Sequence, residues 1–373
     1  MTETQSTVDD TNRMMAIRDN VVKDADKVWI KGIEGFSVCQ WPNTVHGSQA
    51  RILQAMQFPL TYEDLIGYSG FAFRVLNHEA MCPSASHPCC GIACVENSYK
   101  ALPWHTHQYD SFPWSDPKPD RAAFEKEVCD AIKKNIDQGI PVHYGSEEDG
   151  LIIGYADDGK RWWCVHPYYK EGKQAFWMDE LKPEGIEAFA GPKWPWTVRV
   201  WVAPKESDQL VLPKTLTINA LNQAVAMWDQ KVDPNISPKP LHVYFSGDQA
   251  YEKWIGWLEQ VQAGEIKNPK SGMQGNAWCY AVLVHSRHIA AKWLKQQANL
   301  FDGDVQNQLM KIADTYGQIP QVCLKDISST WELFMGPDRF EDWTDDIRSE
   351  QISRLEQVRE LDRTAVQLIR QIV

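Results

Sequence analysis

Apolar and polar positions follow two different patterns along the chain, and the change occurs near Pro204. Before it, apolar residues recur at helical spacing in 45–56 and 121–138, and a shorter helix begins at Thr61. Short apolar runs between turn residues predict strands at 28–30, 71–75, 141–144, 150–155, 161–165, 175–178 and 197–202. After it, the period predicts helices at 215–230, 246–263, 275–300, 303–323 and 345–372. The pattern therefore predicts the α+β fold class with an all-helical C-terminal domain.

Turn residues mark the ends of several of these elements. Gly139 and Pro141 end the helix over 121–138, and Asp157-Asp158-Gly159-Lys160 predicts a hairpin turn between two strands. We expect three parts: a flexible N-terminal arm or single peripheral helix, an α+β domain, and a helical bundle domain, at 1–27, 28–204 and 205–373.

Composition and charge narrow the class of protein. The net charge of −12, without a run of Lys and Arg, disfavours nucleic acid as a partner. The chain has no apolar stretch long enough to span a bilayer, and residues 1–26 lack the apolar core of a signal peptide. Nine cysteines, an odd number, fit a reducing compartment better than a disulfide framework. We therefore expect a cytoplasmic protein that does not bind a membrane.

Two segments follow the order in which a papain-like active site is assembled. The first, Thr44-Val45-His46-Gly47-Ser48-Gln49-Ala50, starts a helix. The second, Asp149-Gly150-Leu151-Ile152-Ile153-Gly154-Tyr155, is a strand that a turn connects to another strand and then to His166-Pro167. A papain-like site takes its nucleophile from the helix and its base and orienting group from the two strands. In these segments the chain resembles the butirosin-biosynthesis acyltransferase N-terminal family and, more distantly, the peptidase-like domains of bacteriocin exporters.

The resemblance covers about residues 30 to 200 and implies a papain-like cysteine-peptidase fold, with helices packed on an antiparallel sheet. It also implies where the catalytic groups would stand. The family's Cys corresponds to Thr44, or to its neighbour Asn43 or His46; its His corresponds to Glu148 or Asp149; and its Asp-Pro corresponds to His166-Pro167. A hydroxyl without a positioned base is a poor nucleophile. The matching positions therefore predict a catalytically degenerate, pseudoenzyme site.

Two groups of cysteines offer other chemistry. Cys39 lies shortly before the helix start, where His46 or His166 could act as its base; the alternative is a buried free cysteine without a chemical role. Glu148 with His166 is a candidate acid–base pair in place of the thiol. A Cys- and His-rich segment over 82–107 contains weak candidates for zinc ligands, although it matches no paired zinc motif. These candidates are Cys82, Cys90 and Cys94. The alternative is a loop packed by small side chains, and we assign no metal or other cofactor.

Several polar residues are candidates for lining a pocket. Arg74 stands on an apolar run, so its charge must meet solvent, an acidic side chain such as Glu148 or Asp149, or a ligand anion. The helix that starts near Gly275 resembles a helical region of the butirosin-type family, which suggests that it borders the same cleft. The predicted ligand-binding residues are Thr44, His46, Arg74, His78, Glu148, Asp149, His166, Tyr168, Asn276 and Trp278.

Three functions remain open from the sequence. The first is a degenerate papain-like protein that binds a small molecule or peptide in a cleft between its α+β and helical domains. The second is a cysteine-dependent acyltransferase or amide hydrolase that uses Cys39. The third is a structural or interaction protein that forms a homodimer through its helical half. We favour the first, because the thiol and its base are replaced together while the pattern of the scaffold is kept.

Overall fold

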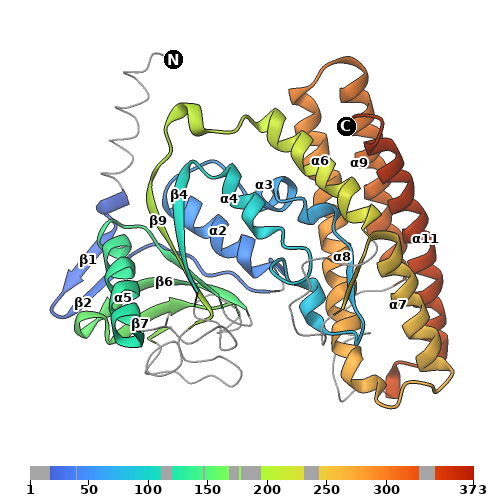
Figure 1. Ribbon diagram of the computed structural model, residues 1–373, viewed down its shortest axis with the longest axis horizontal. Helices are drawn as coiled ribbons and strands as arrows, with labels where there is room; N and C mark the ends of the chain where they lie inside the picture. Colours follow the sequence, from blue (N-terminus) through green and yellow to red (C-terminus); the bar gives the residue numbers. More distant parts are fainter. Residues whose placement is uncertain are drawn as a thin grey trace. The chain divides into compact units, whose positions relative to one another are not determined.

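The computed structural model describes residues 17–38, 40–110, 120–145, 148–167, 176–177, 195–230, 243–326 and 341–373 (Figure 1). The chain forms two compact units. The first combines residues 1–62 with 102–210, and the second combines residues 63–101 with 211–373. Each unit therefore contains one early and one late segment of the sequence.

The first unit is built on an antiparallel sheet. Its strands are β1 (Val21–Asp24), β2 (Lys27–Ile30), β4 (Trp104–Asp110), β5 (Val142–Gly145), β6 (Asp149–Ala156), β7 (Arg161–Val165), β8 (Phe176–Trp177) and β9 (Thr197–Pro204). The main path runs β1-β2-β6-β5-β9-β4. One edge of β6 pairs with β5 and then with β2, and its other edge pairs with β7, which also pairs with β8. This branching places the start of β6 near the middle of the sheet.

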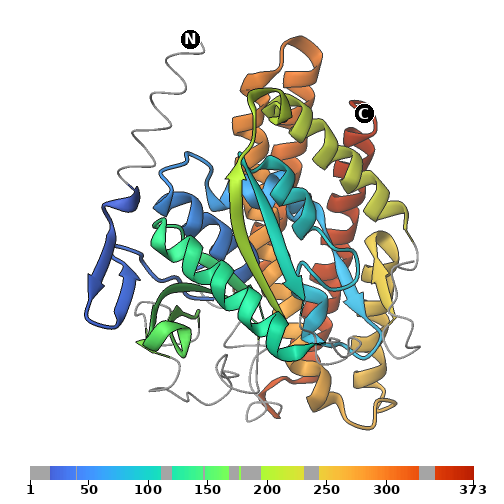
Figure 2. The ribbon, with the colours of Figure 1, turned by 60° about the vertical axis from the view of Figure 1, so that its left-hand side comes forward.

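Helices cover the sheet according to the alternation of side chains along its strands. Val142, Ile152 and Cys164 share a buried core with apolar residues of α5 (Arg121–Asp137), which Figure 2 shows lying along the sheet. Neighbouring side chains in a strand point to opposite faces. The alternate residues of β5 and β6 therefore face α2 (Thr44–Ala55), which contacts both strands. Residues 44–53 of α2 are all buried, as expected for a helix enclosed on every side.

The second unit is mainly helical. Its long helices are α6 (Pro213–Asp229), α7 (Gly247–Gln262), α8 (Pro269–Gln297), α9 (Gly303–Cys323) and α11 (Asp345–Ile369). Its early segment contributes α3 (Tyr62–Tyr68), η1 (Phe71–Phe73), β3 (Leu76–His78), η2 (Pro83–Ser86) and α4 (Val95–Ala101). Figure 1 shows α8, α9 and α11 running side by side. The early segment joins this bundle through β3, which pairs with β10 (Tyr244–Ser246).

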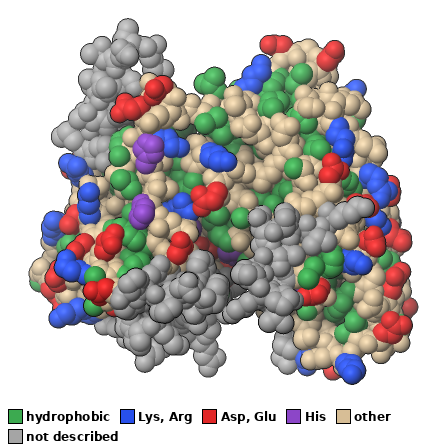
Figure 3. Space-filling view, in the orientation of Figure 1, with side chains coloured by type: hydrophobic (Ala, Val, Ile, Leu, Met, Phe, Trp, Pro, Cys, Tyr) green, Lys and Arg blue, Asp and Glu red, His purple; other side chains and the backbone are tan. Residues whose placement is uncertain are grey.

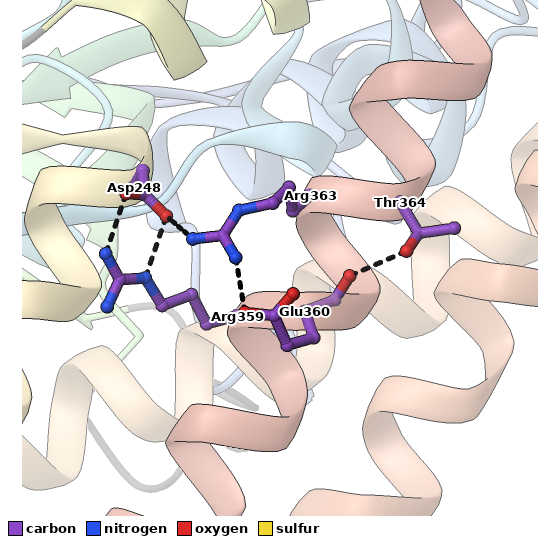
Figure 4. Close-up of polar contacts among 5 residues, drawn as sticks. All are labelled: Asp248, Arg359, Glu360, Arg363 and Thr364. Carbon is purple, nitrogen blue, oxygen red and sulfur yellow. Dashed lines mark hydrogen bonds and ion pairs between the residues drawn. The ribbon is translucent and has the colours of Figure 1, made fainter.

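A buried ion pair and a surface ion network connect elements within this bundle. The Arg287 guanidinium donates two hydrogen bonds to Asp362, at 2.8 and 2.6 Å, and a third at 2.8 Å to the carbonyl of Ala72 in η1. Nearer the surface, Asp248 of α7 accepts hydrogen bonds from Arg359 and Arg363 of α11 (Figure 4). The buried pair therefore ties the early segment to α8 and α11, and the network ties α7 to α11.

Most sequence-predicted elements are confirmed, including the five long helices and the hairpin turn. In that turn Asp157 and Asp158 have φ of 49° and 57°, and Gly159 has φ of 90°. The strand predicted at 71–75 is wrong. Residues 71–73 form a 3₁₀ turn after Gly70, whose φ of 78° reverses the chain, and the strand follows at 76–78. A short apolar run fits either conformation, so its period does not choose between them.

Two predicted boundaries also differ from the structure. The predicted arm over 1–27 includes β1, which pairs with β2 as a hairpin, so part of it belongs to the sheet. The predicted α+β domain over 28–204 includes residues 63–101, which belong to the second unit. The reason is long-range pairing: β3 finds its partner strand in the helical half, and Arg287 of α8 binds the carbonyl of Ala72. A local pattern carries no information on such pairings.

Candidate functional site

The polar start of α2 is the centre of the candidate site. Asn43 caps the helix, because its side-chain oxygen accepts the backbone N–H of His46 at 3.2 Å. The Asn43 backbone N–H in turn donates to the Tyr62 hydroxyl at 3.3 Å, and Tyr62 stacks on Trp41 with ring centroids 4.9 Å apart. These contacts fix the helix start, and with it the position of Thr44.

Thr44 joins the helix start to the start of β6. Its hydroxyl donates to a carboxylate oxygen of Glu148 at 2.6 Å and accepts the backbone N–H of Asp149 at 3.1 Å. Only 1% of Thr44 is exposed, whereas Glu148 is partly exposed. The Thr44 hydroxyl therefore uses its one donor for a carboxylate and one of its two lone pairs for a backbone N–H.

His143 and Asp149 form the second contact of the site. Nε2 of His143 lies 2.7 Å from Oδ1 of Asp149, and both residues are buried. The register of the strands explains the pair: His143 stands opposite Leu151, so Asp149 is its diagonal neighbour on the same face of the sheet. A Cβ at Gly145 would lie 2.7 Å from Oδ1 of Asp149, so only glycine leaves room for this carboxylate.

His166 lies on the other face of the sheet from the Asp149 side chain, next to an aromatic ring. Its imidazole stacks on Tyr144 with ring centroids 6.3 Å apart and planes 29° apart. Burial lowers the pKa of His166 to about 4, although the Asp149 charge opposes this shift. The imidazole is therefore neutral at pH 7. Gly150 separates the two rings along the sheet; a Cβ there would lie 2.7 Å from the Tyr144 hydroxyl.

The structure brings together three of the sequence-predicted residues: Thr44, Glu148 and Asp149. His166 is not among them, because it stacks on Tyr144, whose side chain belongs to the core beside α5 on the other face of the sheet. The structure adds His143, which sequence reasoning missed. The available signal was a histidine inside a predicted strand that immediately precedes the acidic segment, but the register needed to pair it was not readable. His46 lies on the same helix and is completely buried. Cys39 and Tyr168 lie outside the described residues.

The remaining predicted residues belong to the second unit, where each has contacts of its own. Arg74 donates to three backbone carbonyls of the loop over 85–90. His78 Nδ1 accepts the backbone N–H of Ala80, and its ring meets Tyr244 edge-on. Asn276 accepts from Trp254 and exchanges hydrogen bonds with Gln351, and Trp278 is buried. These contacts stabilise the fold of the second unit, and Arg74 also lines a small cavity there.

The candidate zinc ligands do not assemble into a site within the described part of the chain, where no three His, Cys, Asp or Glu side chains form a group able to hold a metal ion. Burial raises the pKa of the Cys94 thiol to about 11, and this thiol points to the carbonyl of Ile92. Cys82 and Cys90 are partly exposed free thiols.

Charge is distributed evenly over the visible surface. On the face that Figure 3 shows, the described Lys and Arg side chains are interspersed with Asp and Glu side chains. Such a mixture gives that face no strong field of one sign. Among the described helices, none combines the length and apolar composition that crossing a bilayer requires.

The arrangement in the first unit has a defined chemical capacity. It contains a hydroxyl hydrogen-bonded to a carboxylate and a buried imidazole–carboxylate pair. The hydroxyl at the helix start is that of Thr44. Comparison of the chain with protein-family models and with curated proteins finds no match. The site must therefore be interpreted from its own geometry.

Proposed function

We propose that the first unit is a papain-like module without thiol chemistry, and that it binds a small molecule or peptide at the start of α2 without transforming it. One observation carries this proposal: the Thr44 hydroxyl is buried and is already bonded to Glu148 and to the backbone of Asp149. A nucleophile needs an accessible atom and a base that is free to take its proton. The hydroxyl at the helix start is not accessible to a substrate.

The order of elements supports the papain-like assignment. The start of α2 meets the start of β6 at Thr44 and Asp149, and His166 follows the next strand. These are the places from which a papain-like site takes its nucleophile, base and orienting group. Asp149 stands at the position of the base, and a carboxylate bonded to His143 does not replace an imidazole that faces the nucleophile.

The polarity of the helix start supports a binding role. Asn43, Thr44, His46, Ser48 and Gln49 are each at most 3% exposed. Burial of polar side chains opposes folding unless they are paired, so a helix that served packing alone would favour apolar residues at these positions. Departures from the packing pattern of this kind concentrate at functional sites. Glu148, which is partly exposed, is the group through which the network meets solvent.

A second candidate function has one contact in its favour. The 2.6 Å distance between the Thr44 hydroxyl and Glu148 is also the distance between a nucleophile and its general base. Acyl transfer or amide hydrolysis could use this pair if a movement exposed Thr44. In that case Glu148 would take the hydroxyl proton, Thr44 Oγ1 would attack the substrate carbonyl, and the amine would leave with that proton. Water or an acceptor amine would then release the acyl group from the Thr44 ester.

The test separates binding from turnover. Purified protein is incubated with a small-molecule and peptide extract, washed, and analysed by native mass spectrometry together with Glu148→Gln. Binding without turnover predicts a ligand that the wild type retains, that elutes with unchanged mass after prolonged incubation, and that Glu148→Gln retains less. Release of a cleaved or transferred product, abolished in Thr44→Val, would establish the second function. Retention of no ligand by the wild type would refute the binding role.

A further inference from the structure

A small cavity in the second unit has a charged wall. It measures about 20 Å³, which is room for about one water molecule or one monoatomic ion. Most of its lining is apolar and comes from Phe71, Leu76, Trp254 and Leu283. Arg74 also lines it and is only 5% exposed. The cavity therefore combines a small volume, an apolar surface and a buried cation.

The guanidinium of Arg74 is held in place but is not neutralised. It donates at 2.9 Å to the carbonyl of His87, at 3.1 Å to that of Ala85 and at 2.8 Å to that of Cys90. These bonds use three of its five N–H groups, and Nε is buried without a hydrogen-bond partner among the described residues. Within the same part of the chain, Arg74 has no ion pair with an Asp or Glu side chain.

The nearest comparison within the unit is Arg287, whose Nη1 donates to the carbonyl of Arg74 at 3.2 Å. Arg287 is completely buried, but its charge is paired with Asp362. The same interior therefore contains one arginine with a carboxylate and one without. A buried charge that lacks a counterion destabilises the folded state by several kcal/mol unless an anion reaches it.

We propose that the cavity beside Arg74 binds one small monovalent anion of about the size of chloride. A water molecule would suit the space less well, because buried waters typically make about three hydrogen bonds. Besides Arg74, the lining offers a water only two polar side chains: Ser86, whose hydroxyl already donates to the carbonyl of Pro83 at 2.7 Å and can therefore only accept, and Cys279, a neutral thiol. Burial raises the pKa of Cys279 to about 12, so it supplies no negative charge of its own.

The first test measures chloride binding directly. The ³⁵Cl NMR line of a sodium chloride solution broadens when chloride exchanges with a protein site. We expect the full chain to broaden the line, Arg74→Gln to lose most of this excess, and Arg51→Gln to keep it. Arg51 is the matched control, because it is a buried arginine of the first unit that also has an Nε without a described partner. Equal broadening by wild type and Arg74→Gln would overturn the proposal, as would equal loss in Arg51→Gln.

The second test keeps the charge of Arg74 and reduces the volume of the cavity. It therefore remains informative if Arg74→Gln fails to fold. Thermal unfolding is followed in sodium chloride and in sodium gluconate at equal ionic strength, because gluconate is too large for the cavity. Binding to the native state predicts a higher midpoint for the wild type in chloride. Ala85→Val narrows the cavity and should lose this difference. If the midpoint difference between chloride and gluconate persists unchanged in Ala85→Val, the anion does not bind in this cavity. The outcome of this test does not depend on the proposed role of the first unit.

Discussion

The Thr44 network makes a quantitative prediction for the first unit. Thr44→Val keeps the shape of the side chain and removes its hydroxyl. Glu148 then loses a hydrogen bond to a charged group, and the buried N–H of Asp149 loses its acceptor. A hydrogen bond to a charged group contributes about 1.5–3 kcal/mol, and an unsatisfied buried donor costs about 1–3 kcal/mol. Because Glu148 is partly exposed and can be hydrated again, we expect a total loss of about 2–3 kcal/mol.

The free energy of unfolding of Thr44→Val is compared with that of Thr44→Ser and analysed in a double-mutant cycle. Thr44→Ser keeps the hydroxyl and should lose no more than about 1 kcal/mol, since it removes one methyl group. The cycle of Thr44→Val with Glu148→Gln should give a coupling energy of about 1 kcal/mol. Urea unfolding gives these energies, and hydrogen exchange at the Asp149 amide separates the first unit from the second. Thr44→Val within about 0.5 kcal/mol of wild type, with unchanged amide exchange, would refute the network.

Three further predictions follow from the second unit. Asp362→Asn should destabilise this unit by about 3–5 kcal/mol, because Arg287 would stay buried without a counterion. Asp248→Asn in the partly exposed network of Figure 4 should cost no more than about 1 kcal/mol. Similar losses of stability in both variants would contradict this account. Hydrogen bonds from Arg359 and Arg363 lower the pKa of Asp248 from 3.8 to about 2. The stability that this carboxylate contributes should therefore be complete above about pH 5 and lost as the pH falls toward 2. The free energies of unfolding of wild type and Asp248→Asn should become equal at that low pH, and a difference that stays constant with pH would exclude the shift. Iodoacetamide should modify Cys90 faster than the buried thiols of Cys94, Cys279 and Cys323. Burial opposes ionisation of Cys90, but His87 and Arg74 outweigh this effect and lower its pKa. Equal modification rates in peptide mapping would refute this prediction.

The sequence predicted the elements of the site better than their partners. Thr44 and Asp149 could be expected to meet, because the order of a helix start and two strand starts is visible in the chain. His143 could not be paired with Asp149 without the register that sets it opposite Leu151. A shift of one residue would turn His143 to the other face of the sheet. The contact therefore depends on pairing between strands, which a local pattern does not encode.

Arg74 illustrates the opposite error. The apolar run before it suggested a strand, and an unpaired cation on a strand suggested a ligand or a carboxylate in the first domain. The run is a 3₁₀ turn, and the guanidinium binds carbonyls of Ala85, His87 and Cys90. Every residue has a backbone carbonyl, so the sequence does not show which carbonyls accept hydrogen bonds from an arginine. An arginine bound by carbonyls therefore looks the same in the sequence as one that binds an anion.

The reactivity of a thiol introduced at position 44 tests the central claim most directly. In Thr44→Cys the new thiol should react slowly with iodoacetamide, since it is buried and faces carboxylates. In Thr44→Cys combined with Asp149→His, an imidazole stands at the position of the papain-like base, and the thiol should react about tenfold faster at pH 7. Peptide mapping resolves this position from the native cysteines. Equal rates in the two variants would contradict the papain-like placement of Thr44 and Asp149.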